Sequence, residues 1–158
     1  MRAARELFKA GLRTPTAVFA SDRSTMIAAF GRAHYVRYDE SSATRLTDIA
    51  QRVRDEYSGD LRNIAGRSQH DVGETKRMLK KFNGIGDTGA DIYLRVVQDV
   101  WTWVRPYFDD RATDSAKRLG LPGAPARLGA LAPRTTAQLA AALVRVTLDD
   151  DLRRQVIG

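Results

Sequence analysis

A glycine turn between two helical patterns is the feature that most restricts how this chain folds. Apolar residues at helical spacing run up to Phe82, and a second helical pattern begins at Asp87. The tripeptide Gly84-Ile85-Gly86 stands between them. Glycine takes a positive φ without steric cost, so the chain can reverse direction there. Residues 72–99 are therefore predicted to form two helices joined by a tight hairpin.

The same turn has the chemistry of a phosphate-binding loop. Because Gly84 and Gly86 carry no side chains, a phosphate oxygen can reach backbone N–H groups at the start of the second helix, where the helix dipole favours an anion. Such a contact reads no base sequence. The alternative is that the turn only connects two core helices, since many helix C-caps and tight turns contain the same glycine pattern. The predicted DNA-binding residues are Arg77, Lys80, Lys81, Gly84, Ile85, Gly86 and Thr88.

The charge of the chain favours a polyanionic partner. The formal net charge is +7, the isoelectric point is about 10.1, and only five of the 26 basic residues are lysines. The planar guanidinium of arginine suits phosphate. A biased genomic base composition is an alternative source of arginine, but cations crowd residues 62–81, immediately before the turn. The predicted partner is duplex DNA, held through its phosphate backbone.

Length and composition exclude several other classes of site. The 158 residues suit one domain, predicted here to span 1–158. No apolar run approaches the roughly 20 residues of a membrane span, and no secretory signal is recognisable, so a cytoplasmic protein is expected. Without cysteine there is no disulfide, thiolate zinc site or iron–sulfur cluster, and His34 and His70 lie far apart in the sequence. We predict no metal and no cofactor.

The periodicity predicts an all-α fold, because nearly every segment has the helical spacing and none alternates as a strand does. Residues 60–70 and 122–133 are expected to be irregular. The helix after the hairpin is expected to carry Trp101 into the core and to end before Pro106. A closing helix is predicted at about 135–156.

The order of these pieces resembles the helix-hairpin-helix DNA glycosylases related to endonuclease III, the HhH-GPD type. The resemblance is carried by the hairpin, the helix after it, and Asp109 before a helix that finishes at Lys117-Arg118-Leu119-Gly120. It implies a glycosylase-like domain that clamps the DNA backbone with the hairpin. It also implies that Asp109 is catalytic, stabilising an oxocarbenium-like sugar as a flipped base leaves. The alternative for Asp109 is an N-cap, since aspartate before a helix is favoured there.

The chain departs from that family in three ways. Thr88 occupies the position of the Schiff-base lysine of bifunctional members, so lyase activity is not expected. The cluster-binding cysteines of many members are absent. The leading helices, which supply part of the core, are also missing before the segment matching 2–11. Whether Met1 is the native start is therefore open.

These observations predict a base-excision-repair-like protein, a monofunctional DNA glycosylase without lyase activity. The first alternative is a non-enzymatic DNA-binding module that keeps only the hairpin. A second is a small helical interaction protein. A homo-oligomer is also open, because an exposed apolar face at residues 3–8 would favour a partner. The sequence does not identify the base that would be removed.

Overall fold

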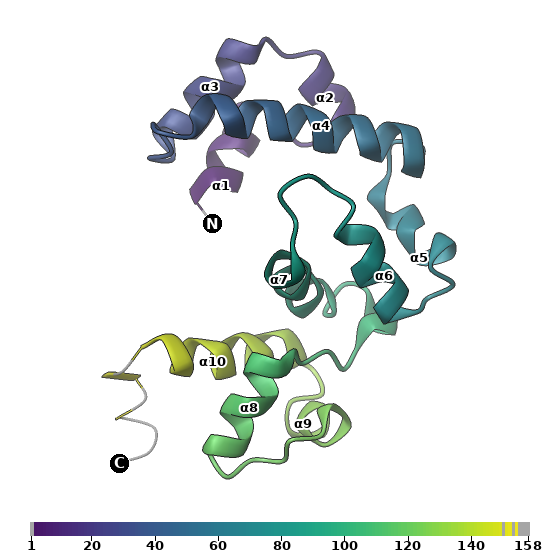
Figure 1. Ribbon diagram of the computed structural model, residues 1–158, viewed down its shortest axis with the longest axis vertical. Coiled ribbons are helices and arrows are strands. Elements are labelled where there is room, and N and C mark those ends of the chain that lie inside the picture. The colour runs from purple at the N-terminus through teal and green to yellow at the C-terminus, as the bar shows by residue number, and fades with distance from the viewer. Residues whose placement is uncertain (1, 150, 153, 155–158) are drawn as a thin grey trace. The chain divides into compact units, whose positions relative to one another are not determined.

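The computed structural model describes residues 2–149, 151, 152 and 154, and their regular structure is helical (Figure 1). These residues form ten α-helices and two short 3-10 helices and contain no strand, which confirms the predicted all-α class. The chain divides into two compact units, residues 1–85 and residues 86–158. The single domain over 1–158 stays a prediction.

The first unit is built on its longest helix, α4 (Asp39–Tyr57). Two shorter helices, α2 (Pro15–Phe19) and α3 (Arg23–Arg32), pack on α4, and α1 (Arg2–Lys9) packs on α3 (Figure 1). Burial of apolar side chains is what holds such short helices together, since isolated helices of this length are marginal in water. The buried cluster consists of Leu12, Val18, Met26, Ala43 and Ala50.

Local signals in the sequence set several helix ends. The Thr14 hydroxyl accepts a hydrogen bond of 3.1 Å from the Ala17 N–H, and Pro15 opens α2. Asp71 caps α6 (Val72–Leu79) by accepting the Glu74 N–H at 2.6 Å. Asp22 is the N-cap residue of α3, yet its side chain forms no capping hydrogen bond.

Residues 60–70, expected to be irregular, contain two short helices instead. They are η1 (Leu61–Asn63) and α5 (Ile64–Arg67). The Asp60 carboxylate accepts the Arg62 N–H at 2.9 Å and starts η1, and the fully buried Ile64 ties the segment to the core. The apolar residues Leu61, Ile64 and Ala65 do have helical spacing, but they span little more than one turn among polar residues, which is why the sequence pattern missed these short helices.

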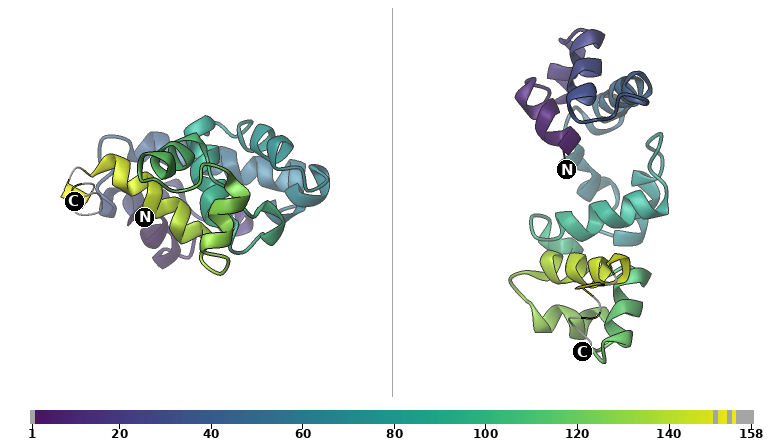
Figure 2. Two further views of the ribbon diagram at one scale, coloured as in Figure 1. Left: turned by 90° about the horizontal axis from the view of Figure 1, so that it is seen from below. Right: turned by 90° about the vertical axis from the view of Figure 1, so that its left-hand side faces the viewer.

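The second unit has a core of its own, formed around α8 (Asp110–Arg118) and α10 (Thr136–Leu148). Figure 2 shows these two helices side by side, and α10 also contacts α7 (Asp87–Val97). Alanines on α8 and α10 allow the close approach. The buried cluster consists of Phe108, Ala112, Ala116, Leu128, Ala140, Leu143 and Val144.

The helix after the hairpin is shorter than predicted. It ends at Val97, so Trp101 lies outside α7, just before the short helix η2 (Thr102–Val104). The buried amide of Gln98 explains the end: it donates to the Tyr107 carbonyl at 2.9 Å and accepts the Tyr107 N–H at 2.8 Å. The Gln98 side chain thus binds the backbone at Tyr107, and α7 does not continue for a further turn.

Trp101 lies outside any α-helix and is half-buried in an aromatic group. Its ring stacks on Trp103 with centroids 5.8 Å apart and meets Tyr93 edge-on at 5.6 Å. The neighbouring Val100 is 78% exposed. The prediction that a regular helix extends to this point and carries Trp101 into the core was therefore wrong.

Residues 122–133 also form more structure than expected. Pro125 opens α9 (Pro125–Leu131), and the fully buried Leu128 joins the core of the second unit. The closing helix α10 ends at Leu148, and Asp149 is extended. Residues 151, 152 and 154 are helical again, and the rest of the predicted 149–156 stretch lies outside the described residues.

We predict that Leu128→Ala destabilises the second unit by about 2–5 kcal/mol, because it leaves a cavity under α9. Urea unfolding followed by circular dichroism measures the change. Leu131→Ala is the matched control: it lies on the same helix, is 56% exposed, and should change the free energy of unfolding by about 0.5 kcal/mol or less. Equal effects of both changes would show that α9 is not packed as described.

Candidate nucleic-acid interface

The first half of the predicted hairpin belongs to the first unit and forms a tight turn. The N–H of Ile85 donates to the Phe82 carbonyl at 3.0 Å. Gly84 has φ +86°, the left-handed conformation that favours glycine. Its backbone N–H has no hydrogen-bond partner among the described residues. The turn therefore presents a backbone donor.

Phe82 anchors this turn to α4. It is buried and stacks on Tyr57 with ring centroids 5.9 Å apart and planes 16° from parallel. The Arg52 guanidinium lies 5.7 Å from the Phe82 centroid, and the Arg67 guanidinium lies 5.5 Å from that of Tyr57. Burial raises the pKa of Tyr57, so the ring between Arg67 and Phe82 stays neutral. Each of the two stacked rings therefore has one guanidinium over it.

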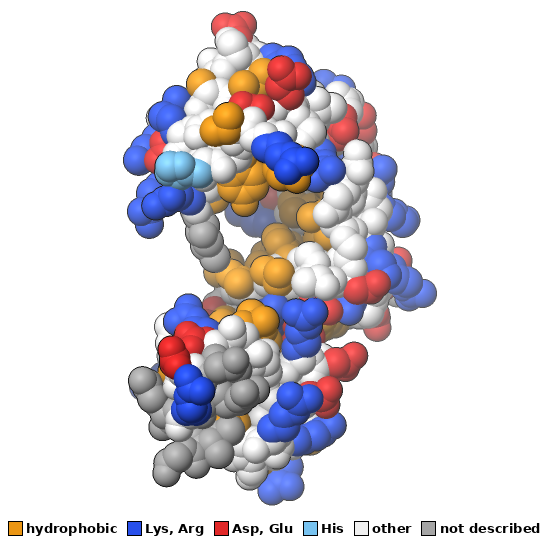
Figure 3. Space-filling model, turned by 60° about the vertical axis from the view of Figure 1, so that its left-hand side comes forward, with side chains coloured by type: hydrophobic (Ala, Val, Ile, Leu, Met, Phe, Trp, Pro, Cys, Tyr) orange, Lys and Arg blue, Asp and Glu red, His pale blue; other side chains and the backbone are white. Residues whose placement is uncertain are grey.

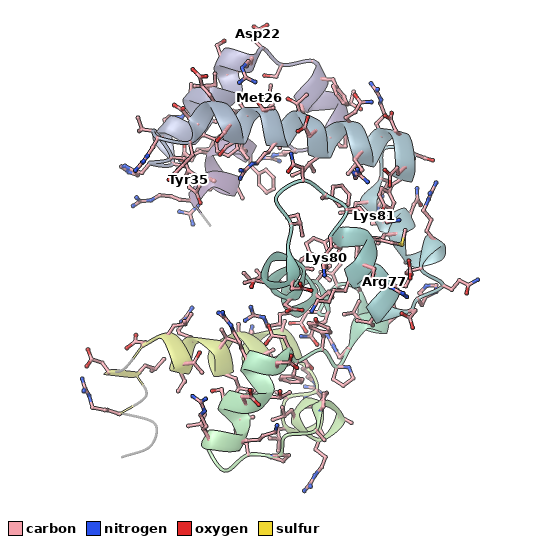
Figure 4. All side chains as sticks on the ribbon, viewed as in Figure 1. Asp22, Met26, Tyr35, Arg77, Lys80 and Lys81 are labelled. Carbon is pink, nitrogen blue, oxygen red and sulfur yellow. The ribbon has the colours of Figure 1, made fainter. Side chains whose placement is uncertain are left out.

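The predicted cations lie along α6 and the start of the turn, where Figure 4 labels Arg77, Lys80 and Lys81. All three are exposed. Arg77 pairs with Glu74 at 2.5 Å, and Lys81 forms no ion pair within the described part of the chain. Positive side chains also appear elsewhere on the visible surface (Figure 3), so the number of cations does not distinguish this segment.

Arg45 is a cation beside the turn that sequence reasoning missed. A Cβ built on Gly84 would lie 3.6 Å from the Arg45 Cδ and 3.8 Å from its Nε and Nη1 atoms. Arg45 comes from α4, is exposed, and forms no ion pair among the described residues. Nothing in the local sequence relates positions 45 and 84, because their contact depends on how the hairpin packs on α4.

The second half of the hairpin belongs to the second unit and begins α7. Gly86 is the N-cap residue, with φ −94° and ψ −168°, and no side chain caps the helix. The N–H of Gly86 has no partner in the described residues. Thr88 is exposed in the first turn of α7. An added Cβ on Gly86 would meet no atom within 4 Å.

Asp109 is the N-cap of α8, as one of its two predicted roles requires. Its Oδ1 accepts the Ala112 N–H at 2.9 Å. Its Oδ2 lies 3.1 Å from the Nε of Arg95, and the two side chains are only 7% and 10% exposed. The Arg95 Nε finds no acceptor with hydrogen-bond geometry, so the contact is an ion pair without an aligned hydrogen bond. Both carboxylate oxygens are therefore occupied within the unit.

Tyr107 and Asp91 extend this polar group. The Tyr107 hydroxyl donates to the Asp91 Oδ1 at 2.5 Å. Burial, followed by that hydrogen bond and the Asp91 charge, raises the pKa of Tyr107, so its hydroxyl keeps its proton. The Gln98 amide fixes the backbone of the same tyrosine. These hydrogen bonds hold the Tyr107 backbone in the segment that leads into α8.

The predicted site residues divide between the two units. Arg77, Lys80, Lys81, Gly84 and Ile85 belong to the first, and Gly86, Thr88 and Asp109 belong to the second. In the described residues no three His, Cys, Asp or Glu side chains gather as they would around a metal ion. Across the same residues, every helix is too short or too polar to cross a bilayer.

Comparisons with known proteins do not identify a relative. A scan of protein-family models, a search of curated proteins and a search of solved structures each found no match to this chain. The functional interpretation therefore rests on the residues and their geometry.

We predict that the Arg95–Asp109 pair holds α8 in place. Asp109→Asn keeps the capping acceptor but leaves the Arg95 charge buried without a counter-charge, so it should cost about 3–5 kcal/mol. The double variant Arg95→Met/Asp109→Asn should recover most of that loss. Urea unfolding of the four proteins in the cycle measures the coupling.

The matched control for this pair is Asp114→Asn on the same helix. Asp114 pairs with Lys117 at 3.3 Å, and both side chains are more than half exposed. Its removal should change stability by at most about 1 kcal/mol. Additive costs for Arg95 and Asp109 in the cycle would contradict the proposed pairing.

Proposed function

We propose that the protein binds duplex DNA through backbone phosphates, with the hairpin around Gly84 and Gly86 as the contact. The observation that carries the proposal is the pair of glycine N–H groups that lack partners, in a segment approached by exposed cations. A hydrogen bond from a backbone N–H is stronger when its acceptor is charged, as a phosphate oxygen is. The resemblance to the helix-hairpin-helix glycosylases supports the same assignment.

The charges near the turn favour an anion over a neutral partner. Lys81 and Arg45 have no acidic partner in the described residues, and Arg77 is 73% exposed beside Glu74. A cation without an internal partner can neutralise a phosphate and release its condensed counterions without first breaking an ion pair. Since a contact to a backbone phosphate carries no information about the base, the expected binding has little sequence preference.

Base excision is the second candidate, and Asp109 is the observation that favours it. The carboxylate stands immediately before α8, where the glycosylase resemblance places the catalytic aspartate. Its oxygens are occupied by the Ala112 N–H and Arg95, however, and its side chain is 7% exposed. In this geometry Asp109 would act through its charge on a developing oxocarbenium ion. Phosphate binding by the hairpin does not depend on a catalytic role for Asp109, so we rank DNA binding above base excision.

We predict that duplex DNA binding weakens linearly in log affinity against log salt, with a slope of about −0.9 for each phosphate neutralised. Fluorescence anisotropy with two unrelated duplex sequences measures both the slope and the lack of preference. A flat salt dependence, or binding limited to one of the two sequences, would contradict a phosphate clamp.

Glycine variants test whether the DNA closely approaches the backbone of the turn or is held only by diffuse positive charge. Gly86→Ala adds a methyl group that meets no protein atom within 4 Å, so folding should survive while DNA affinity falls about tenfold or more. Gly66→Ala, in α5 and equally open, is the matched control and should bind normally. Gly86→Arg adds a positive charge and should also weaken binding. Tighter binding by Gly86→Arg would mean that charge alone explains the affinity.

We predict that any base excision is monofunctional, because the Thr88 hydroxyl cannot form an imine with an abasic sugar. Borohydride should trap no Thr88-dependent adduct on abasic DNA, whereas alkali after incubation with damaged duplexes would reveal base loss. The Arg95→Met/Asp109→Asn variant removes the carboxylate charge without leaving Arg95 unpaired, so it should fold and lose excision. Excision that persists in this variant would exclude Asp109 from catalysis.

A further inference from the structure

Arg45 and the Gly84 turn present hydrogen-bond donors at one place on the first unit. The guanidinium Nε and Nη1 lie 3.8 Å from the position a Gly84 Cβ would occupy, and Gly84 itself is exposed. The Gly84 N–H has no acceptor among the described residues, and neither does the Arg45 guanidinium. Donors without an acceptor that lie this close together match an anion with several oxygens.

The other two arginines of α4 have partners, which sets Arg45 apart. Arg52 pairs with Glu56 at 2.7 Å and lies over the Phe82 ring. Arg54 pairs with Asp55 at 3.0 Å and lies 4.7 Å from the Phe19 centroid. Arg45 has neither a carboxylate nor an aromatic face in the described structure. Its charge is therefore available to a ligand.

We propose that Arg45 and the Gly84 N–H together bind one phosphate group, so that α4 contributes a cation to the hairpin contact. The inference rests on the proposed DNA binding and extends it from the hairpin to a helix distant in sequence. The planar guanidinium can donate two bonds to a phosphate while the glycine amide donates a third. The Phe82–Tyr57 stack supports this arrangement, since it fixes the turn against α4.

The proposal also gives a reason for a small residue at position 84 beyond its φ. A methyl group there would contact the Arg45 Cδ at 3.6 Å and lie 3.8 Å from the Nε and Nη1 of the guanidinium. The side chain could still pack against such a methyl group, because 3.6 Å is an ordinary contact distance. The methyl group would, however, take up space beside these nitrogens that the proposed phosphate needs.

Matched arginine variants on α4 test the contact with DNA. Arg45→Gln should weaken duplex binding about tenfold or more and reduce the salt slope by about 0.9, whereas Arg54→Gln, with the same charge change on the same helix, should leave the slope unchanged. Arg45→Lys, which keeps the charge without the planar fork, should bind with intermediate affinity. Thermal unfolding of each variant confirms that the fold is intact.

Equal losses in Arg45→Gln and Arg54→Gln would overturn the proposal in favour of diffuse charge. Wild-type affinity in Arg45→Gln would overturn it as well, while leaving the hairpin as a DNA contact.

Inorganic phosphate tests the site independently of DNA. In ¹⁵N–¹H spectra, phosphate should shift the Arg45 Nε and Gly84 amide resonances together, and Arg45→Gln should remove the Gly84 shift. These shifts without any duplex binding by the wild-type protein would support the phosphate site and reject DNA as its ligand. Duplex binding without either shift would retain the proposed function and reject the site at Arg45.

Discussion

The stacking of Phe82 on Tyr57 is the contact on which the geometry of the hairpin turn depends. Phe82 is the last buried residue before the turn, and the ring beneath it belongs to α4. Aromatic pairs add about 0.5–1.5 kcal/mol beyond the burial of their area, and each cation over a ring adds about 0.5–1 kcal/mol at an exposed site. Because the turn begins from this fixed point, Gly84 lies beside Arg45, two helical turns before Arg52.

The arginines show why net charge alone is a poor guide to the binding surface. Arg95 is buried and balances Asp109 inside the second unit, whereas Arg52 supports an aromatic ring and pairs with Glu56. These charges contribute to the total of +7, yet they already have internal partners. Arg45 and Lys81 have none in the described structure. The candidate surface is therefore defined by where these two cations lie, beside the Gly84 turn, and not by the net charge.

The sequence predicted what depends on near neighbours and missed what depends on packing. Asp109 was identifiable as an N-cap because a cap bonds to a residue three positions away. Leu128 lies in a segment rich in Pro, Gly and Ala, where periodicity gives no signal, although it is fully buried. The end of α7 was missed because Gln98 bonds to Tyr107, nine positions on. Arg45 could be assigned to the turn only from the structure.

The two glycines of the turn occur for different physical reasons, and the difference bears on function. Gly84 has φ +86°, so the backbone itself favours glycine there. Gly86 has φ −94°, which any residue adopts, and a Cβ on it would touch nothing within 4 Å. Alanine would therefore fit at position 86 without strain in the described structure. Glycine is a favoured N-cap residue even without a ligand, so a reason for Gly86 beyond capping comes only from the proposed DNA binding, in which a phosphate approaches the start of α7.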